Sequence, residues 1–202
     1  MDVDLFDAHC EHLLVRTVPA DEAPARVVGT YRVLTPAAAH RLGGLYSEGE
    51  FDLVRLARLH PDFAELGRSC TDPRWRTGGV ILTLWSSLGD SLQRNGLQGI
   101  IGCASVPMYS GGHLAADLWR DLSRACLAPP DLEVRPRLPL PLARLGSRSP
   151  AEPPPLVKGY LRRGAKVLGP PAWDPDFGTA DLPMMLGPAD LPAAYRRRLI
   201  AS

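Results

Sequence analysis

The sequence predicts an α/β fold of the α+β type, in which helices pack on a mixed, mostly antiparallel sheet as a three-layer sandwich. Three features predict it. A strand pair lies near the N-terminus, a strongly amphipathic helix follows a third strand, and an apolar strand then leads into a second amphipathic helix. The chain has 202 residues, and we expect one domain over 1–202.

The first strand pair is predicted at 12–16 and 26–34, joined by a Pro-bounded, acidic turn at 19–24. Such a short connection makes the two strands antiparallel neighbours. In the second strand Val27, Tyr31 and Val33 share one face, and Thr30 and Arg32 share the other. A short helix or loop is expected at 36–42, followed by an acidic loop at 47–52.

The helix after the third strand is the most strongly patterned element of the sequence. The strand is predicted at 62–70, and it leads through a Gly78-Gly79 turn into the helix. Asn95-Gly96 is a typical helix end. The apolar residues recur at helical spacing and form one stripe: Ile81, Leu84, Trp85, Leu88 and Leu92.

The second half of the chain begins with an apolar strand at 98–105, of the kind found in buried parallel sheets. A second amphipathic helix follows, with one apolar side: Leu114, Leu118, Leu122 and Ala125. Residues 129–155 are rich in proline and are predicted to be an extended connection within the domain. A basic segment at 158–166 follows, and a last helix is expected to end in Arg196-Arg197-Arg198.

Composition excludes several classes of protein. The net charge is +1 with a pI near 7.7, which argues against a dedicated nucleic-acid binder. The charge is uneven, because 1–130 carry −3 and 131–202 carry +4. No apolar run approaches the ~20 residues of a membrane span, and no secretory leader is visible. We therefore expect a cytoplasmic protein.

Cysteine and histidine usage predicts neither disulfides nor a metal site. The four cysteines form no C-x-x-C pair, which fits a reducing compartment: Cys10, Cys70, Cys103 and Cys126. His9-Cys10-Glu11-His12 has the residue types of a metal site, but it enters a strand. Alternate side chains of a strand point to opposite faces, so these four cannot converge on one ion.

A Gly-rich turn before the amphipathic helix could bind phosphate. The N-terminus of a helix presents free N–H groups and a partial positive charge, and glycines let an anion approach them. Arg74, Arg76, Gly78 and Gly79 would form this cradle. No G-x-x-x-x-G-K-[ST] motif is present, which disfavours a nucleotide triphosphatase.

Glu65 and Arg68 are candidate catalytic residues in the third strand. A carboxylate within an apolar run needs a partner, and Arg68 is the nearest cation. Residues i and i+3 of a regular strand face opposite ways, but a bulge at Gly67 would turn both toward one cleft. The alternative is a structural ion pair that also includes Arg32.

Several motifs together resemble a known family. They are Asp4-Leu5-Phe6-Asp7, His9 to Val15, Gly29 to Arg32, Tyr46 to Asp52, Glu65 to Cys70, Ile101 to Ser105, Lys158 to Leu161 and Pro170 to Gly178. In this order they resemble the ornithine-lipid acyltransferases, which belong to the GNAT-like superfamily and are related to the acyl-homoserine-lactone synthases. Some members carry a hemolysin label. The resemblance covers nearly the whole chain.

The resemblance implies a reaction. The α-amine of ornithine attacks the thioester of a 3-hydroxyacyl chain on acyl carrier protein, and the product is a lyso-ornithine lipid. The acidic D-x-x-D motif then corresponds to Asp4 and Asp7, the following strand arginine to Arg32, and the E-x-x-R motif to Glu65 and Arg68. By this resemblance the expected substrate-binding residues are Asp4, Asp7, Arg32, Ser69 and Ser105.

The residue types suit this chemistry. An α-ammonium has a reference pKa of about 8 and must lose a proton before it attacks, and Glu65 is the candidate base. Arg74, Arg76 and the two glycines would hold the phosphopantetheine phosphate of the donor. No Ser-His-Asp or Cys-His system is evident, so direct transfer is favoured. Cys70 and Cys103 are expected to be buried small hydrophobes.

The expected partners are acyl carrier protein, an amino acid acceptor and, peripherally, the anionic inner face of the cytoplasmic membrane. The only cofactor expected is the acyl-phosphopantetheine thioester itself, which is a substrate. Lys158, Arg162, Arg163 and Lys166 alternate with apolar residues and form either a binding surface for these partners or a solvated helix face. Trp173 and Phe177 are expected to pack in the core.

Three alternatives stay open. The acceptor could be glycine or glutamine, the donor could be acyl-CoA, or the chain could be a non-catalytic binding remnant. The third arises because the family carries an N-terminal strand and helices ahead of the D-x-x-D loop, whereas here Asp4 lies three residues after Met1. A pore-forming hemolysin is the least favoured.

Overall fold

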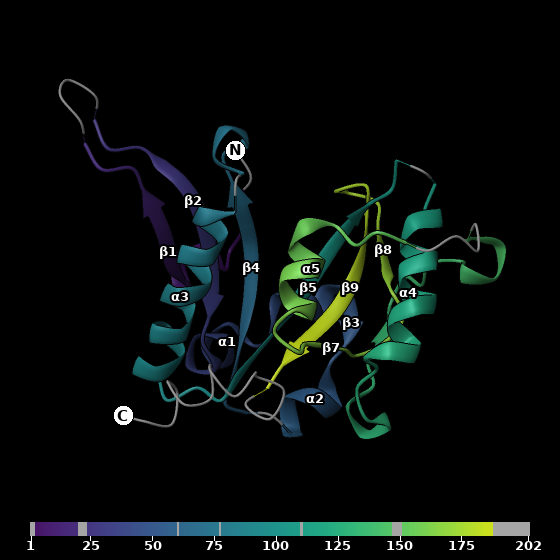
Figure 1. Cartoon of the computed structure of the whole chain (residues 1–202). Coiled ribbons are helices and arrows are strands. Elements are labelled where there is room, and N and C mark those ends of the chain that lie inside the picture. Colours follow the sequence, from purple (N-terminus) through teal and green to yellow (C-terminus); the bar gives the residue numbers. More distant parts are fainter. Residues whose placement is uncertain are drawn as a thin grey trace. The chain divides into compact units, whose positions relative to one another are not determined.

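The computed structural model describes residues 3–19, 24–59, 61–76, 78–109, 111–146 and 151–187 (Figure 1). They form two compact units, which we describe separately. The first contains Met1–Leu45 and Asp62–Gln98, and the second contains Tyr46–Pro61 and Gly99–Ser202.

The first unit is an antiparallel sheet covered by a helix. Strands β1 (Glu11–Arg16), β2 (Val27–Leu34) and β4 (Phe63–Thr71) lie in the order β1-β2-β4. Helix α3 (Gly79–Arg94) packs on β1 and β2 (Figure 1).

Burial in α3 confirms most of the predicted apolar stripe. Leu84, Trp85, Leu88 and Leu92 are buried, while Ile81 is only half-buried beside the buried Val80.

The two faces of β2 have different neighbours, as the alternation of its residues predicts: one face packs against α3 and the other carries Arg32. Gly29 and Tyr31 face α3: a Cβ on Gly29 would lie 2.3 Å from Val80 Cγ1, and the Tyr31 ring meets the Trp85 ring edge-on at 6.0 Å. Arg32 points to the opposite face. The close approach of α3 requires glycine at position 29. The opposite face of the sheet is the one that carries the polar group of Arg32.

Helix α1 (Pro36–Leu42) follows β2, as expected for 36–42. Thr35 caps its N-terminus by accepting from the Ala38 N–H at 3.3 Å, and Gly43 ends it at φ +84°. Leu34, Ala38 and Ala39 form a small apolar cluster against which Phe6 and Cys10 pack. This cluster anchors the N-terminal segment, including the η1 turn (Asp7–His9), to the unit.

The second unit is built around two long antiparallel strands, β5 (Gly99–Pro107) and β9 (Thr179–Leu186). The short strands β7 (Lys166–Val167) and β8 (Ala172–Asp174) pair with β9, and helix α4 (His113–Ala125) packs on β5.

The remaining elements of this unit are short: η2 (Tyr46–Gly49), β3 (Phe51–Asp52), α2 (Val54–Leu59), η4 (Pro130–Leu132), β6 (Arg135–Pro136), η5 (Leu142–Arg144) and α5 (Pro155–Leu161). The turn η3 (Pro73–Trp75) belongs to the first unit.

Several expectations need correction. The acidic loop at 47–52 is ordered as η2 and β3, and β3 pairs with β6 inside the Pro-rich connection. No strand is predicted from the sequence over Thr179–Leu186, yet β9 is the central strand of its unit. The predicted C-terminal helix ending at Arg196-Arg197-Arg198 lies outside the described residues. The single domain predicted for 1–202 stays a prediction.

Candidate functional site

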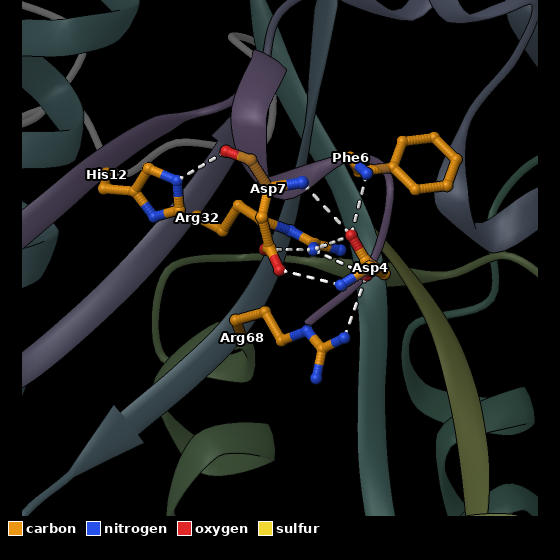
Figure 2. Close-up of polar contacts among 6 residues, drawn as sticks. All are labelled: Asp4, Phe6, Asp7, His12, Arg32 and Arg68. Atoms are coloured by element: carbon orange, nitrogen blue, oxygen red, sulfur yellow. Dashed lines mark hydrogen bonds and ion pairs between the residues drawn. The ribbon is translucent and has the colours of Figure 1, made fainter. Parts of the chain in front are cut away.

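The D-x-x-D motif forms a closed loop at the start of the first unit (Figure 2). The Asp4 N–H donates to Asp7 Oδ2 at 3.0 Å, and the Asp7 N–H donates back to Asp4 Oδ1 at 3.1 Å. Asp4 Oδ1 also accepts from the Phe6 N–H at 2.8 Å. The spacing of three residues permits this reciprocal bonding, which aims both carboxylates at the sheet.

Arg32 is the centre of the cluster. Its Nη1 donates to Asp4 Oδ2 and to Asp7 Oδ1, both at 2.7 Å (Figure 2). Its side chain is only 4% exposed, whereas those of Asp4 and Asp7 are 21% and 26% exposed. A buried guanidinium requires such compensation, so the two carboxylates neutralise the charge that β2 carries inside the unit.

Arg68 joins the cluster because β4 bulges next to it. Arg32 pairs with Gly67 and Thr30 with Cys70, so Tyr31 stands opposite both Arg68 and Ser69. Arg68 has φ +51°, which is the left-handed conformation of a bulge. Its Nη2 donates to Asp4 Oδ2 at 2.9 Å, and its side chain is 24% exposed. The irregularity predicted around Gly67 is therefore present.

Opposite charges fix the ionisation of this cluster. The backbone N–H of Asp4 and the guanidinium of Arg32 lower the pKa of the Asp7 carboxyl. Burial opposes the charge of Arg32, but its bonds to Asp4 and Asp7 prevail and raise the pKa of its guanidinium. Burial, with the nearby carboxylates, raises the pKa of the Cys10 thiol to about 11. Asp7 and Arg32 thus each stabilise the charge of the other.

Glu65 lies on the same face of the sheet as Arg32. It pairs with Leu34, two residues along from the Arg32–Gly67 pair, and side chains at these positions share a face. Glu65 also contributes to the electrostatic environment of Cys10. The residue is 3% exposed, so a substrate proton can reach it only through water or a neighbouring group. Its catalytic role stays a prediction.

The predicted phosphate cradle lies at the start of α3. Gly78 has φ +97°. Among the residues that the structure describes, nothing lies within 4 Å of a Cβ placed on Gly78 or Gly79, and no side chain caps the helix. Arg74 is 64% exposed and pairs with Asp72 at 2.9 Å, which lowers the pKa of Asp72 to about 2. Arg76 Nε donates to the Thr71 carbonyl at 3.3 Å. The helix end is open, and both guanidinia are at the surface.

Ser105 lies in a second polar cluster, which belongs to the second unit and was not predicted from the sequence. Ser105 is exposed on β5 and pairs with Asp181 of β9, whose carboxyl group it hydrogen-bonds. Asp181 is 3% exposed. Glu50 approaches the same carboxyl group from the loop before β3, and a hydrogen bond joins the two.

Like charges surround Glu50. One carboxyl oxygen each from Glu50, Asp174 and Asp181 lies within 4.8 Å of the others. Burial, together with the charges of Asp181 and Asp174, raises the pKa of the Glu50 carboxyl to about 8. Burial, with the charge of Asp174, also raises the pKa of the Asp181 carboxyl, against the hydrogen bonds from Ser105, Glu50 and Thr179 that lower it. A carboxylate inside the apolar run around Leu182 was the available signal, the same one that singled out Glu65.

Other side chains depart from expectation. Arg163 is 9% exposed and donates to the Gly159 carbonyl at 3.0 Å, so it does not belong to a basic surface. Lys158 pairs with Glu152. Trp173 and Phe177 are 42% and 56% exposed rather than packed. Cys70 is exposed and Cys103 is half-buried, so neither is the fully buried hydrophobe expected.

Comparisons with known proteins bear on this arrangement. Residues 1–86 match the family of acetyltransferase (GNAT) domains. The L-ornithine N(alpha)-acyltransferase of Rhizobium meliloti (strain 1021) is 36% identical over 200 residues, which cover 92% of this chain and 66% of that protein. The protein of the same name from Agrobacterium fabrum (strain C58 / ATCC 33970) is 34% identical and covers 96% of this chain and 70% of its own length.

The chain belongs to the L-ornithine N(alpha)-acyltransferase family. This confirms the family resemblance and, with the GNAT match, the predicted fold class. The chain spans about two thirds of the length of the curated members it matches.

Among solved structures, a CoA-dependent acyl-homoserine lactone synthase with SAM and isopentyl-CoA is similar at a TM-score of 0.49 and 14% identity, over 98% of this chain and 66% of that chain. None of the helices in the described part of this L-ornithine N(alpha)-acyltransferase family member is both long and apolar enough to cross a membrane.

Proposed function

We propose that the protein transfers an acyl group from a thioester to the α-amine of ornithine. The observation that supports it is the identity to L-ornithine N(alpha)-acyltransferases over up to 96% of this chain. The donor is a 3-hydroxyacyl chain on acyl carrier protein, and the product is a lyso-ornithine lipid. Both are consistent with the family and with the thioester chemistry of GNAT domains.

The cluster of the first unit serves the acceptor. Arg68 is the guanidinium that a carboxylate can reach, because a quarter of its side chain is exposed while Arg32 is buried. Asp4 and Asp7 then hold these arginines in place rather than binding the amino acid directly. Glu65 takes the proton from the α-ammonium through a water molecule, since the residue itself is buried.

The open end of α3 serves the donor. Arg74, Arg76 and the N–H groups beginning at Gly78 and Gly79 bind the phosphate of phosphopantetheine. Direct attack of the amine on the thioester follows, without an acyl-enzyme. Backbone N–H groups stabilise the oxyanion of the tetrahedral intermediate.

The test is the product itself. The chain is expressed in a bacterial host that makes no ornithine lipids, and extracts are analysed by mass spectrometry after feeding ornithine, glycine or glutamine. N-acylornithine is expected. An N-acyl derivative of another amino acid would reassign the acceptor, and no product with any acceptor would favour a non-catalytic binding protein.

Two variants test the site. Glu65→Gln and Arg68→Ala should each lower kcat/KM for ornithine by about 100-fold or more, since each removes a group that acts on the acceptor. Arg16→Ala, a matched change at an exposed position of the same sheet, should leave the rate unchanged. Near-normal rates for both site variants would remove Glu65 and Arg68 from the reaction.

The carrier partner is tested with purified acyl carrier protein and acyl-CoA as alternative donors. Lys158→Gln with Arg162→Gln should weaken carrier binding a few-fold at low salt, because acidic carriers are steered by surface cations. Arg163 is left unchanged in this experiment because it is buried. Unchanged binding, or a preference for acyl-CoA, would overturn the carrier assignment.

A further inference from the structure

The D-x-x-D loop is bonded to a side chain that lies outside it, the imidazole of His12 (Figure 2). His12 Nε2 lies 2.8 Å from the carbonyl oxygen of Asp7. A carbonyl oxygen only accepts, so Nε2 carries a hydrogen and donates it. Both the neutral ring with hydrogen on Nε2 and the imidazolium can do so, and the bond therefore survives protonation of the ring.

The place of His12 in the sheet explains how it reaches the loop. It is the second residue of β1 and lies directly opposite Arg32 of β2. Residues directly opposite each other share a face of the sheet. The imidazole therefore lies on the same face as the guanidinium that bonds both aspartates of the motif.

The start of β1 is anchored on its other face. Glu11 precedes His12, and neighbouring side chains of a strand point to opposite faces. Glu11 Oε2 accepts from Ser91 Oγ at 2.9 Å, and its Oε1 accepts from Asn95 Nδ2 at 3.1 Å. Ser91 lies near the end of α3 and Asn95 is its C-cap. The strand is therefore fixed to the helix, and His12 bonds the loop from a fixed position.

The bond from His12 completes the attachment of Asp7 to the sheet. The Asp7 carboxylate bonds Arg32 of β2, and its carbonyl bonds His12 of β1. The residue is thus held through both its side chain and its backbone. Because the Asp7 N–H donates to Asp4 Oδ1, the orientation of Asp7 also sets that of the Asp4 carboxylate.

Asp4 carries this order to Arg68. Its Oδ2 accepts from Arg68 Nη2 at 2.9 Å, and the Arg68 side chain is 24% exposed. A long side chain loses rotamer freedom when it binds a ligand, and one that is already held in place loses less. An ordered loop therefore favours the binding of a carboxylate by Arg68.

We propose that His12 is a positioning residue for the amino acid acceptor: its bond to the Asp7 carbonyl orders the D-x-x-D loop and, through Asp4, orients Arg68 for the acceptor's carboxylate. This inference rests on the proposed function, which assigns that carboxylate to Arg68. His12 takes no part in making or breaking bonds. Its removal therefore weakens acceptor binding and leaves the chemical step intact.

The experiment measures kcat and KM for ornithine at saturating acyl donor. His12→Ala should raise KM about tenfold and change kcat less than about twofold, since only the preorganisation of the binding group is lost. His12→Gln keeps a side-chain N–H for the same carbonyl, so its KM should stay within about threefold of wild type. His9→Ala, at an exposed histidine of the same turn, is the matched control and should alter neither value.

A double-mutant cycle tests whether the effect passes through Arg68. In the Arg68→Ala background, His12→Ala should raise KM less than about twofold, because the guanidinium that it orders is gone. A tenfold rise that persists in this background would overturn the inference. So would a His12→Ala variant whose kcat falls while KM is unchanged, which is the result of a merely structural role.

A measurement without activity separates this inference from the proposed function. Nitrogen-15 relaxation of the Arg68 Nε–H group reports the picosecond-to-nanosecond motion of its side chain. We expect more motion in His12→Ala than in wild type, and recovery in His12→Gln. Equal motion in all three proteins would contradict the role of His12, whereas absence of product from wild type would contradict the proposed function.

Discussion

Two polar clusters, one in each unit, contain carboxyl groups that are wholly or partly buried, and the two clusters differ in the charges around them. In the first unit Asp4 and Asp7 surround Arg32, and each negative charge meets a positive one. In the second unit Glu50 meets Asp181 and Asp174, which are like charges. The first arrangement lowers the pKa of Asp7, and the second raises that of Glu50 to about 8. The first therefore suits fixed binding charges, and the second suits proton exchange.

The most severe test of the comparison removes the central cation. Arg32→Met should lower the free energy of unfolding by about 3 kcal/mol, because it leaves Asp7 without its cationic partner and Asp4 with Arg68 alone. Arg32→Lys should recover part of this, since a lysine keeps the charge but not the fork of donors. Denaturant unfolding measures both, with Arg16→Met as the exposed control. A loss under about 1 kcal/mol would mean that solvent already screens the cluster.

Asp4 should contribute more to the free energy of unfolding than Asp7. Asp4 accepts from two backbone N–H groups and from both arginines, whereas Asp7 bonds only Arg32 and the Asp4 N–H in this cluster. Asp4→Asn should therefore cost about 2 kcal/mol and Asp7→Asn about 1 kcal/mol. Equal losses would show that the loop, rather than the ion pairs, sets the stability.

Much of the first unit was predictable because its signals are local. The strand pair, α1, the stripe of α3 and the irregularity near Gly67 all follow from short-range patterns. The composition of the cluster followed only from the family resemblance, because nothing local joins Asp4 to Arg68 across the sequence.

The second unit was predicted less well, for physical reasons. In β9, Pro183 interrupts the apolar run and lacks a backbone donor, which argues against a central strand. Asp181 breaks the same run, and its partner Glu50 comes from a distant acidic loop. Partners are predicted from sequence by matching opposite charges. A contact between two acidic residues, such as Glu50 and Asp181, is therefore not predicted.

Replacing Glu50 should affect stability much less than replacing Arg32. Glu50→Gln keeps the shape, removes a group that is already neutral, and ends its repulsion with Asp174. At pH 5, where much of this glutamate is still protonated in the unfolded chain, the free energy of unfolding should change by less than about 1 kcal/mol. A loss as large as that of Arg32→Met would mean that position 50 needs an ionised carboxylate. The two clusters would then not differ in the protonation of their carboxyl groups.

Ion pairs outside the two clusters should contribute least. Arg74 and Asp72 form a surface pair that solvent screens, so Arg74→Ala should leave the free energy of unfolding nearly unchanged. With Arg76→Ala it should raise KM for the acyl donor about fivefold, because phosphate binding is lost while the chemical step is intact. A fall in kcat with unchanged KM would contradict a phosphate-binding role.

The pH dependence of stability tests the central contrast most directly. A carboxyl group whose pKa is raised on folding holds its proton in the native state after the unfolded chain has released it. The contribution of Glu50 to the free energy of unfolding therefore falls as pH rises from the ordinary glutamate pKa of 4.5 to about 8. Above that pH its contribution no longer changes. The limiting slope is about 1.4 kcal/mol per pH unit for one proton.

Unfolding of wild type and Glu50→Gln is measured between pH 5 and 9. The free energy of unfolding of wild type should fall relative to that of Glu50→Gln as pH rises to 8, whichever protein is the more stable at pH 5. Parallel curves would show that Glu50 holds no proton and would contradict the account.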